Sequence, residues 1–301
     1  ALARLSSAQS GPTFKGYRRK NGAVGVRNEI WIIPTVSCAN HTADVLAKLA
    51  SVEFGDACDG IFAFPHNSGC SQLGDDHRMT QKLLAAIAKH PNAGGVLLVS
   101  LGCENNNIHE FLPVLGDYDR DRFRVLVTQE AGDEIGTGLE LLRELAEIVK
   151  RDKRVRVPVS ELKIAFKCGG SDSLSGVTAN PLCGTVADRI TSLGGSAVLT
   201  EVPEMFGAET ILMNRADSRE TFEKVVNLIN SFKQYYLDYG QPVYENPSPG
   251  NKEGGITTLE EKSLGCVQKG GRAVVSDTLD YGEPVRRPGL NLMTGPGNDN
   301  V

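Results

Sequence analysis

Unbroken apolar runs constrain the fold of this 301-residue chain more than any other feature. Between residues 28 and 129 the runs IWIIP, IFAF, GVLLVSLG and FRVLV are each followed by a longer amphipathic stretch. Continuous rather than alternating apolar residues are typical of strands that are buried on both faces, as in a parallel sheet. Strands that alternate with helices therefore predict an α/β fold, a Rossmann-like parallel sheet flanked by helices.

The charged stretch KRDKRVRVPVSE indicates a boundary between two halves. We expect a linker and entry segment over residues 1–27, a first α/β region over 28–157 and a second, smaller α/β region over 158–301. In the second region LKIAFK and SAVLTEV are predicted strands, and residues 180–194 and 218–240 are predicted helices. Residues 244–271 are predicted to form an irregular active-site loop, because long irregular segments in compact domains are usually functional or disordered.

Composition excludes several classes of protein. The net charge of -5 and the lack of a lysine- or arginine-rich run argue against a nucleic-acid partner. No apolar stretch approaches the roughly 20 residues that a membrane helix needs. The seven cysteines are an odd number without compact spacing, which fits reduced thiols better than a disulfide framework. We expect a soluble cytoplasmic protein that acts on a small molecule.

Four cysteines lie at or just past the ends of predicted strands: Cys38, Cys70, Cys103 and Cys168. One cysteine in such a place more often packs than reacts, but four at equivalent places favour a shared site. Ligands of parallel α/β sheets bind outside the carboxyl ends of the strands. Cysteine and histidine with an occasional carboxylate suit ferrous iron or zinc, and four thiolates suit an iron–sulfur cluster. Spacing leaves these alternatives open, and the candidate ligands are Cys38, His66, Cys70, Cys103, Glu104 and Cys168.

Polar groups gather at three further places. In KCGGSDSLSGVTANP the glycines Gly169 and Gly170 let backbone N–H groups approach an anion, although a plain loop-to-helix turn has the same composition. EVPEMFGAE supplies carboxylates that suit a hard cation or simply begin a helix. Residues 246–271 supply many hydrogen-bond donors, as a mobile surface loop also would. The donors are Asn251, Lys252, Thr257, Lys262 and Lys269.

Several segments carry a family resemblance. They are GYRRKNGAVGVRNEIWIIPTVSCAN, FPHNSGCSQLGDDH, HPNAGGVLLVSLGCENNN, KCGGSDSLSGVTANP, EVPEMFGAE, NPSPGNKEGGITTLEEKSLGCVQKGG and GPGND. In order and over nearly the whole chain they resemble the altronate/galactarate dehydratase (altronate hydrolase) family, most closely its altronate branch. A sulfolactate sulfo-lyase shares the same core.

The resemblance implies a lyase that removes water from a hexonic or hexaric acid and gives a 2-keto-3-deoxy acid, with ferrous iron required. It also implies a homodimer and a small N-terminal domain joined by a linker. Relatives continue past GPGND with a helix and a strand. We therefore expect segments beyond both ends of this chain, and an inactive dimerisation fragment is an alternative. A non-catalytic nucleotide-binding module is disfavoured because the phosphate fingerprint is missing.

Dehydration of a sugar acid needs a base, an acid and a group that stabilises the enediolate. A cation supplies several kcal/mol of that stabilisation, whereas general acid–base help contributes about a hundred- to ten-thousand-fold. We expect Lys167, if burial lowers its pKa, or Lys252 to be the base. Asp172 or His66 is the expected proton donor. The expected substrate contacts are Asn251, Lys262, Ser171, Gly169 and Gly170, with Lys262 and Asn251 anchoring the carboxylate.

Overall fold

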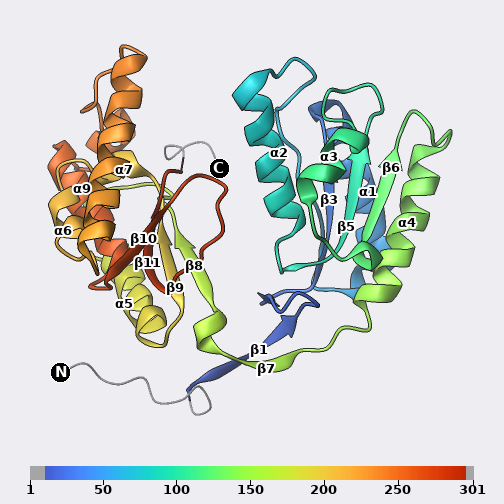
Figure 1. Ribbon diagram of the computed structural model, residues 1–301, viewed down its shortest axis with the longest axis horizontal. Coiled ribbons are helices and arrows are strands. Elements are labelled where there is room, and N and C mark those ends of the chain that lie inside the picture. The colour runs from blue at the N-terminus through green and yellow to red at the C-terminus, as the bar shows by residue number, and fades with distance from the viewer. Residues whose placement is uncertain (1–10, 296–301) are drawn as a thin grey trace. The chain divides into compact units, whose positions relative to one another are not determined.

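The computed structural model describes residues 11–295 and divides them into two compact units, one from Phe14 to Val157 and the other from Pro158 onward with the stretch before Phe14 (Figure 1). Each unit has its own four-stranded sheet in which all neighbouring strands run parallel. The prediction of an α/β fold with parallel sheets and flanking helices is confirmed. The segment GPGND lies almost wholly outside the described residues.

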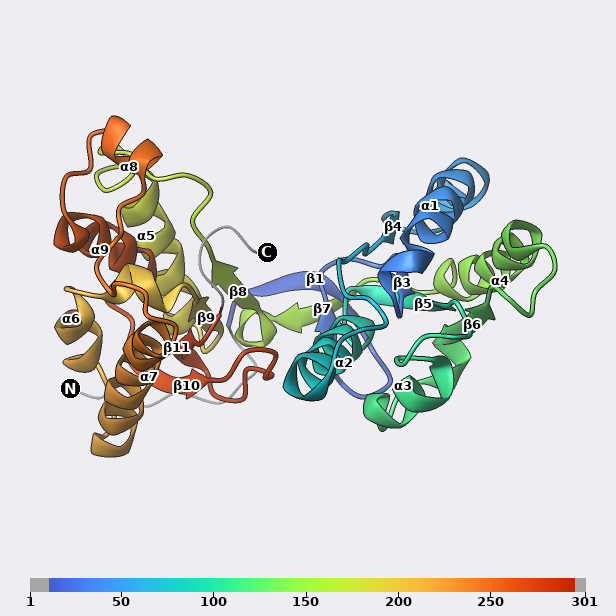
Figure 2. The ribbon, with the colours of Figure 1, turned by 90° about the horizontal axis from the view of Figure 1, so that it is seen from above.

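The first sheet has the strand order β4-β3-β5-β6. Its strands are β3 (Glu29–Pro34), β4 (Ile61–Ala63), β5 (Ala93–Ser100) and β6 (Phe123–Val127). The helices that connect and flank them are α1 (Asn40–Phe54), α2 (Gly74–Ala88), α3 (Ile108–Leu115) and α4 (Glu134–Val149). Figure 2 shows α1 and α4 on one face of the sheet and α2 and α3 on the other.

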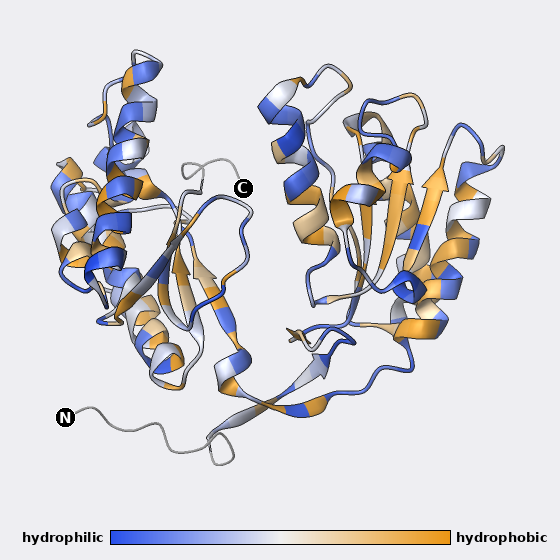
Figure 3. Cartoon of the chain, viewed as in Figure 1, coloured by the Kyte–Doolittle hydropathy of each residue, from blue (hydrophilic) through white to orange (hydrophobic). Residues whose placement is uncertain are grey.

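Alternate residues of the two central strands explain why these runs are apolar throughout. In β3, Ile30 and Ile32 pack with α1 and α4, while Trp31 and Ile33 pack with α2 and α3. The residues of β5 alternate between the same two faces, with Leu97 and Val99 on the side of α1 and α4 and Val96 and Leu98 on the side of α2 and α3. Figure 3 shows much of β5 in the colour of hydrophobic residues. Burial of both faces of a parallel strand is therefore what removes the period-two pattern from the sequence.

The second sheet has the order β10-β11-β9-β8. Its strands are β8 (Lys163–Phe166), β9 (Ser196–Leu199), β10 (Val275–Leu279) and β11 (Gly289–Met293). The helices of this unit are α5 (Ala179–Ser192), α6 (Glu209–Met213), α7 (Arg219–Asp238), α8 (Pro249–Glu253) and α9 (Leu259–Val267). One apolar cluster joins the sheet to α5, α7 and α9.

Two predictions about irregular segments are wrong. Part of the expected linker forms β1 (Thr13–Arg18) and β2 (Val24–Gly25), which join β7 (Val155–Pro158) in a small sheet. The expected irregular loop at 244–271 contains α8 and α9. The start of α9 has a sequence signal, because the side chain of Thr258 accepts a hydrogen bond from the backbone N–H of Glu261, as in a capping box.

None of the helices in the described range is long and apolar enough to cross a membrane.

Candidate functional site

Three exposed free cysteines lie at the carboxyl-terminal edge of the first sheet: Cys38, Cys70 and Cys103. Cys38 lies in the short 3-10 turn after β3, Cys70 in the loop after β4, and Cys103 shortly after β5. Because β4, β3 and β5 are adjacent and parallel, their carboxyl ends meet at one edge (Figure 1). We call this group the thiol edge.

The thiols of this edge influence one another electrostatically. The Cys70 thiol is largely exposed, but partial desolvation raises its pKa, and the nearby Cys38, Cys103 and Glu104 raise it further. Several thiolates at one place repel each other, and a bound cation would relieve that repulsion.

Glu104 fixes the turn that carries Cys103. Its carboxylate is buried and accepts hydrogen bonds from Thr35 Oγ1 at 2.6 Å, Ser100 Oγ at 2.6 Å, Leu101 N at 3.0 Å and Gly102 N at 2.7 Å. Both oxygens are thus engaged by protein donors from β3 and the end of β5. Glu104, predicted as a metal ligand, serves in the structure to hold the strand ends together.

Replacement of Glu104 by glutamine should lower the free energy of unfolding by about 2–4 kcal/mol at pH 7, because an amide nitrogen would face donors that need an acceptor. Burial acts to raise the pKa of Glu104, but the hydrogen bonds outweigh it and the pKa lies below its ordinary value. This stabilisation is therefore complete above the unfolded pKa of about 4.3 and is lost as the pH falls through the folded pKa.

Denaturant unfolding followed by the fluorescence of Trp31, the single tryptophan, measures this effect in the first unit. The exposed Glu110 on α3 is the matched control, and its change to glutamine should alter the free energy by less than about 0.5 kcal/mol. Equal stability of the Glu104→Gln variant and the unmodified protein at pH 7 would contradict the role given to Glu104.

His66 and Asn105 order the loop of Cys70. Asn105 Nδ2 donates to the Cys70 carbonyl at 2.6 Å. His66 Nδ1 accepts from the Ser68 N–H at 3.1 Å, so Nε2 carries the proton and donates to the Pro34 carbonyl at 2.9 Å. Both ring nitrogens are occupied. This does not support the predicted role of His66 as proton donor.

The donor chemistry of the thiol edge fits iron, although its side chains do not form a closed coordination group. Thiolates are soft ligands that suit iron and zinc. Within residues 11–295 no three His, Cys, Asp or Glu side chains lie in an arrangement that could hold a metal ion as it stands. Cys70 lies in a loop without helix or strand.

Cys168 belongs to the other sheet. It follows β8 in the second unit, so the prediction that four thiols share one sheet edge is wrong for this residue. Its backbone N–H donates to Glu201 Oε2 at 2.8 Å, and its Sγ lies 3.0 Å from Ser171 Oγ. The error arose because an apolar run in the sequence predicts a strand but does not show which sheet that strand joins.

The glycine-rich turn after Cys168 offers open backbone donors. Among the described residues the N–H groups of Gly169 and Gly170 have no hydrogen-bond partner, and a side chain built at either position would meet no atom within 4 Å. Lys167, just before the turn, is exposed. The burial that its predicted role as base required is therefore absent, whereas an ammonium beside two free N–H groups suits a carboxylate.

Asp172 closes this turn. Its Oδ1 accepts from the Ser175 N–H at 2.8 Å and from Ser175 Oγ at 2.9 Å. These hydrogen bonds lower the pKa of Asp172, so the carboxylate stays ionised at neutral pH. The prediction that Asp172 donates a proton is not supported.

A buried network of two carboxylates and two ammonium groups lies below the turn. Lys269 Nζ lies 3.4 Å from Glu201 Oε2 and 3.3 Å from Glu204 Oε2. Lys262 Nζ lies 3.3 Å from Glu204 Oε1. Glu201 begins this corner in the left-handed conformation, with φ of 62°, a strained backbone for a residue other than glycine.

Lys262 and Asn251 are committed to this network. The ammonium of Lys262 donates to Asn246 Oδ1 at 2.9 Å and to Asn251 Oδ1 at 2.7 Å, and its ion pair with Glu204 places a third protein oxygen beside it. Asn251 Nδ2 donates in turn to the Ser171 carbonyl at 2.9 Å. The prediction that Lys262 and Asn251 anchor a substrate carboxylate is therefore not supported. Sequence reasoning found the carboxylates of this corner but not their partners.

A cavity of about 240 Å³ lies beside the network, between the glycine-rich turn and α9. Its polar lining consists mainly of hydroxyl and amide groups, which suit the hydroxyl groups of a polyol. They are Ser171, Ser173, Ser175, Asn180 and Gln268. Lys252 on α8 is exposed, as Lys167 is.

Two units, each built on a parallel sheet, one with a thiol edge and one with an open glycine-rich turn, place the chain among the α/β proteins. The model of "D-galactarate dehydratase/Altronate hydrolase, second domain" matches residues 16–150, and that of "D-galactarate/Altronate dehydratase, C-terminal" matches residues 159–301. The chain belongs to the D-galactarate/altronate dehydratase family.

Named relatives agree with this assignment. The chain is 55% identical to the altronate dehydratase of Bacillus subtilis and 53% identical to that of Escherichia coli, in both cases over 95% of its own length and 58% of theirs. It is 32% identical to the (2R)-sulfolactate sulfo-lyase subunit beta of Chromohalobacter salexigens, over 94% of this chain and 71% of that one. The chain thus spans less than two thirds of the altronate dehydratases.

Proposed function

We propose that this chain carries the core of an altronate-type dehydratase, a hydro-lyase that turns a hexonate into a 2-keto-3-deoxy acid by loss of water. The observation that carries the proposal is the level of identity. It is 55% and 53% with two altronate dehydratases, but 29% with the galactarate dehydratase of Escherichia coli and 32% with the sulfo-lyase subunit. The enzyme acts in the cytoplasm as a homodimer.

We propose ferrous iron as the cofactor, with Cys38, Cys70 and Cys103 as its ligands. When bound, such a cation stabilises negative charge on a neighbouring carboxylate and hydroxyl. Glu104 holds the Cys103 turn, and Asn105 holds the Cys70 loop. An iron–sulfur cluster uses the same thiols and is the alternative form of the metal.

In the second unit the turn from Lys167 to Ser171 is the candidate site for the substrate carboxylate. The free N–H groups of Gly169 and Gly170 and the ammonium of Lys167 supply three donors for an anion. Hydroxyl groups of Ser173 and Ser175 in the adjoining cavity suit substrate hydroxyls. Lys252 on α8, which is exposed, remains the candidate base, whereas Lys167 is assigned to the substrate carboxylate.

The proposal predicts strong substrate discrimination. The purified protein, supplied anaerobically with ferrous iron, should form 2-keto acid from altronate with kcat/KM at least about a hundredfold above the values for galactarate and sulfolactate. Such a ratio needs only about 3 kcal/mol of differential binding in the transition state. Faster conversion of galactarate, or release of sulfite from sulfolactate, would assign the chain to that activity instead.

A further inference from the structure

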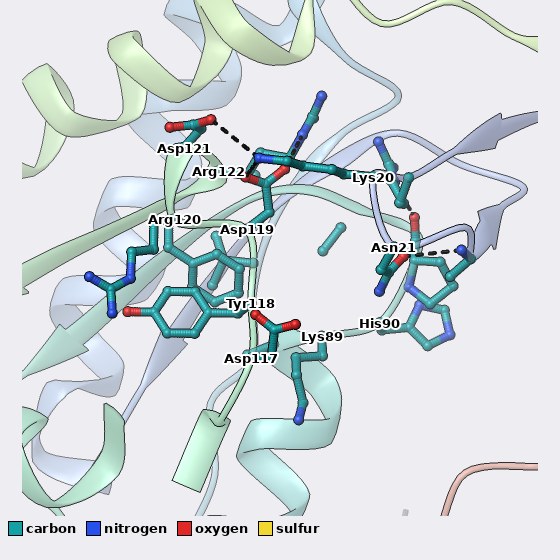
Figure 4. Close-up of a pocket in the computed structure, with 18 residues that line it drawn as sticks. Lys20, Asn21, Lys89, His90, Asp117, Tyr118, Asp119, Arg120, Asp121 and Arg122 are labelled. Atoms are coloured by element: carbon teal, nitrogen blue, oxygen red, sulfur yellow. Dashed lines mark hydrogen bonds and ion pairs between the residues drawn. The ribbon is translucent and has the colours of Figure 1, made fainter. Parts of the chain in front are cut away.

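A second cavity, of about 500 Å³, opens in the first unit (Figure 4). It lies at the amino-terminal ends of β5 and β6, between the β1–β2 turn, the end of α2 and residues 117–123. The thiol edge is at the opposite ends of these strands. A strand of about six residues spans roughly 20 Å, so one small molecule does not reach both places. The volume is that of a small-ligand site.

One wall of this cavity is rigid. Asp152 accepts from Arg122 at 2.6 and 2.8 Å and from Arg19 at 3.1 Å. Arg19 Nε also donates to the Pro91 carbonyl at 2.7 Å, and Arg122 donates to the Gly94 carbonyl at 2.7 Å. These two guanidinium groups are committed to the protein. They hold this wall of the cavity in place, so contacts to a ligand would come from other side chains.

Three other cations at the cavity have unused donors. The guanidinium of Arg120 lies over the ring of Tyr118 at 5.9 Å and makes no hydrogen bond or ion pair within the described residues. Lys89 Nζ donates once, to the Leu115 carbonyl at 2.8 Å, which leaves two N–H groups. Lys20 Nζ lies 3.7 Å from Asp119 and 4.0 Å from Asp121, beyond hydrogen-bond length. Figure 4 labels all three among the residues that line the cavity, with Arg120 beside Tyr118 and Lys20 on the opposite side of the view.

Carboxylates line the same space. Asp119 Oδ1 is buried and accepts no hydrogen bond from the described residues, and Asp117 and Asp121 are exposed. A metal cation would be repelled by Lys20, Lys89 and Arg120, and a simple anion would be repelled by the aspartates. A ligand with both an anionic group and several hydroxyls satisfies both sets, because hydroxyls donate to carboxylates while the ammonium and guanidinium groups bind the anion.

We propose that this cavity binds a polyhydroxylated anion, either an acidic sugar or a sugar phosphate, at a site separate from the thiol edge. Arg120 binds the anionic group, the aspartates accept hydrogen bonds from the hydroxyls, and the ring of Tyr118 contacts the carbon skeleton. The site does not depend on the proposed dehydratase activity, because binding alone defines it.

Trp31 provides the readout. It is the single tryptophan of the chain and stacks on His90 with ring centroids 5.3 Å apart, and His90 lines the cavity. The protein is titrated with D-gluconate, with glucose 6-phosphate and with neutral sorbitol. At least one of the two anions should give a saturable change in Trp31 fluorescence, with an affinity at least tenfold higher than that for sorbitol. Saturation by gluconate alone assigns a carboxylate ligand, and by glucose 6-phosphate alone a phosphate ligand.

Variants locate the binding. Arg120→Ala changes an exposed residue and should lower the affinity for the anion at least tenfold. Arg143→Ala on α4 should leave that affinity unchanged, since Arg143 pairs with Glu53 away from the cavity. Cys103→Ser should leave the affinity unchanged. The proposal is overturned if no anion saturates the signal, if Arg120→Ala binds as well as the unmodified protein, or if Cys103→Ser abolishes binding.

Discussion

Replacing Lys262 by methionine should lower the free energy of unfolding by about 3–5 kcal/mol, because the change leaves Glu204 as a buried charge with one ammonium partner in place of two. Lys262 has no exposed side-chain surface, and Glu204 is 2% exposed. Asn246 Oδ1 would also lose its donor, whereas Asn251 Oδ1 would keep those from the Ser248 N–H and Oγ. Denaturant unfolding followed by circular dichroism measures the loss.

The matched control is Lys224→Met on α7. Lys224 pairs with Glu220 and Asp277 at the surface, and surface pairs contribute about 0–1 kcal/mol. Adding Glu204→Gln to the Lys262 variant should restore part of the stability, because the uncompensated charge is then removed. A Lys262→Met variant as stable as the Lys224→Met control would show that the network is not a stabilising element.

Replacing Cys103 by serine should lower bound iron and dehydratase activity together, each by at least about tenfold, because a hydroxyl is a much weaker ligand for iron than a thiolate. Cys103 is exposed, and its Sγ accepts one weak hydrogen bond, from Gln129 Nε2 at 3.4 Å. The substitution should therefore leave folding intact. Metal analysis of anaerobically purified protein gives the iron content independently of activity.

Cys58→Ser is the control for this prediction. Cys58 lies in the same unit, but its thiol donates to the Gly60 carbonyl, and burial raises its pKa. Iron content and activity should both be unchanged in that variant. Normal iron in Cys103→Ser would remove Cys103 from the metal site.

Much of the fold follows from the sequence because burial leaves a direct mark on it. The runs around Ile32 and Leu97 are apolar at every position since both faces of β3 and β5 are covered. Strands β10 and β11 were not predicted. Their segments VSDTL and GLNLM carry polar residues such as Asp277 and Asn291, which mask the apolar run.

The thiol edge was predictable in part, because the rule that parallel strands end at one edge needs only the position of each cysteine after a strand. The rule gave a wrong prediction for Cys168, because the sequence does not show which sheet each strand joins. The roles of Glu104 and Lys262 depend on partners such as Thr35 and Glu204, far away in the chain. Which buried donors meet which acceptors is decided by tertiary packing, and local patterns do not contain it.

The chemistry proposed for this chain depends on iron bound by the cysteines of the thiol edge. X-ray absorption spectroscopy at the iron edge, on protein loaded anaerobically with ferrous iron, reports the atoms bound to the metal. We expect sulfur ligands on the iron, fewer of them in Cys103→Ser and the same number in Cys58→Ser. Iron bound only by oxygen and nitrogen in the unmodified protein would contradict it.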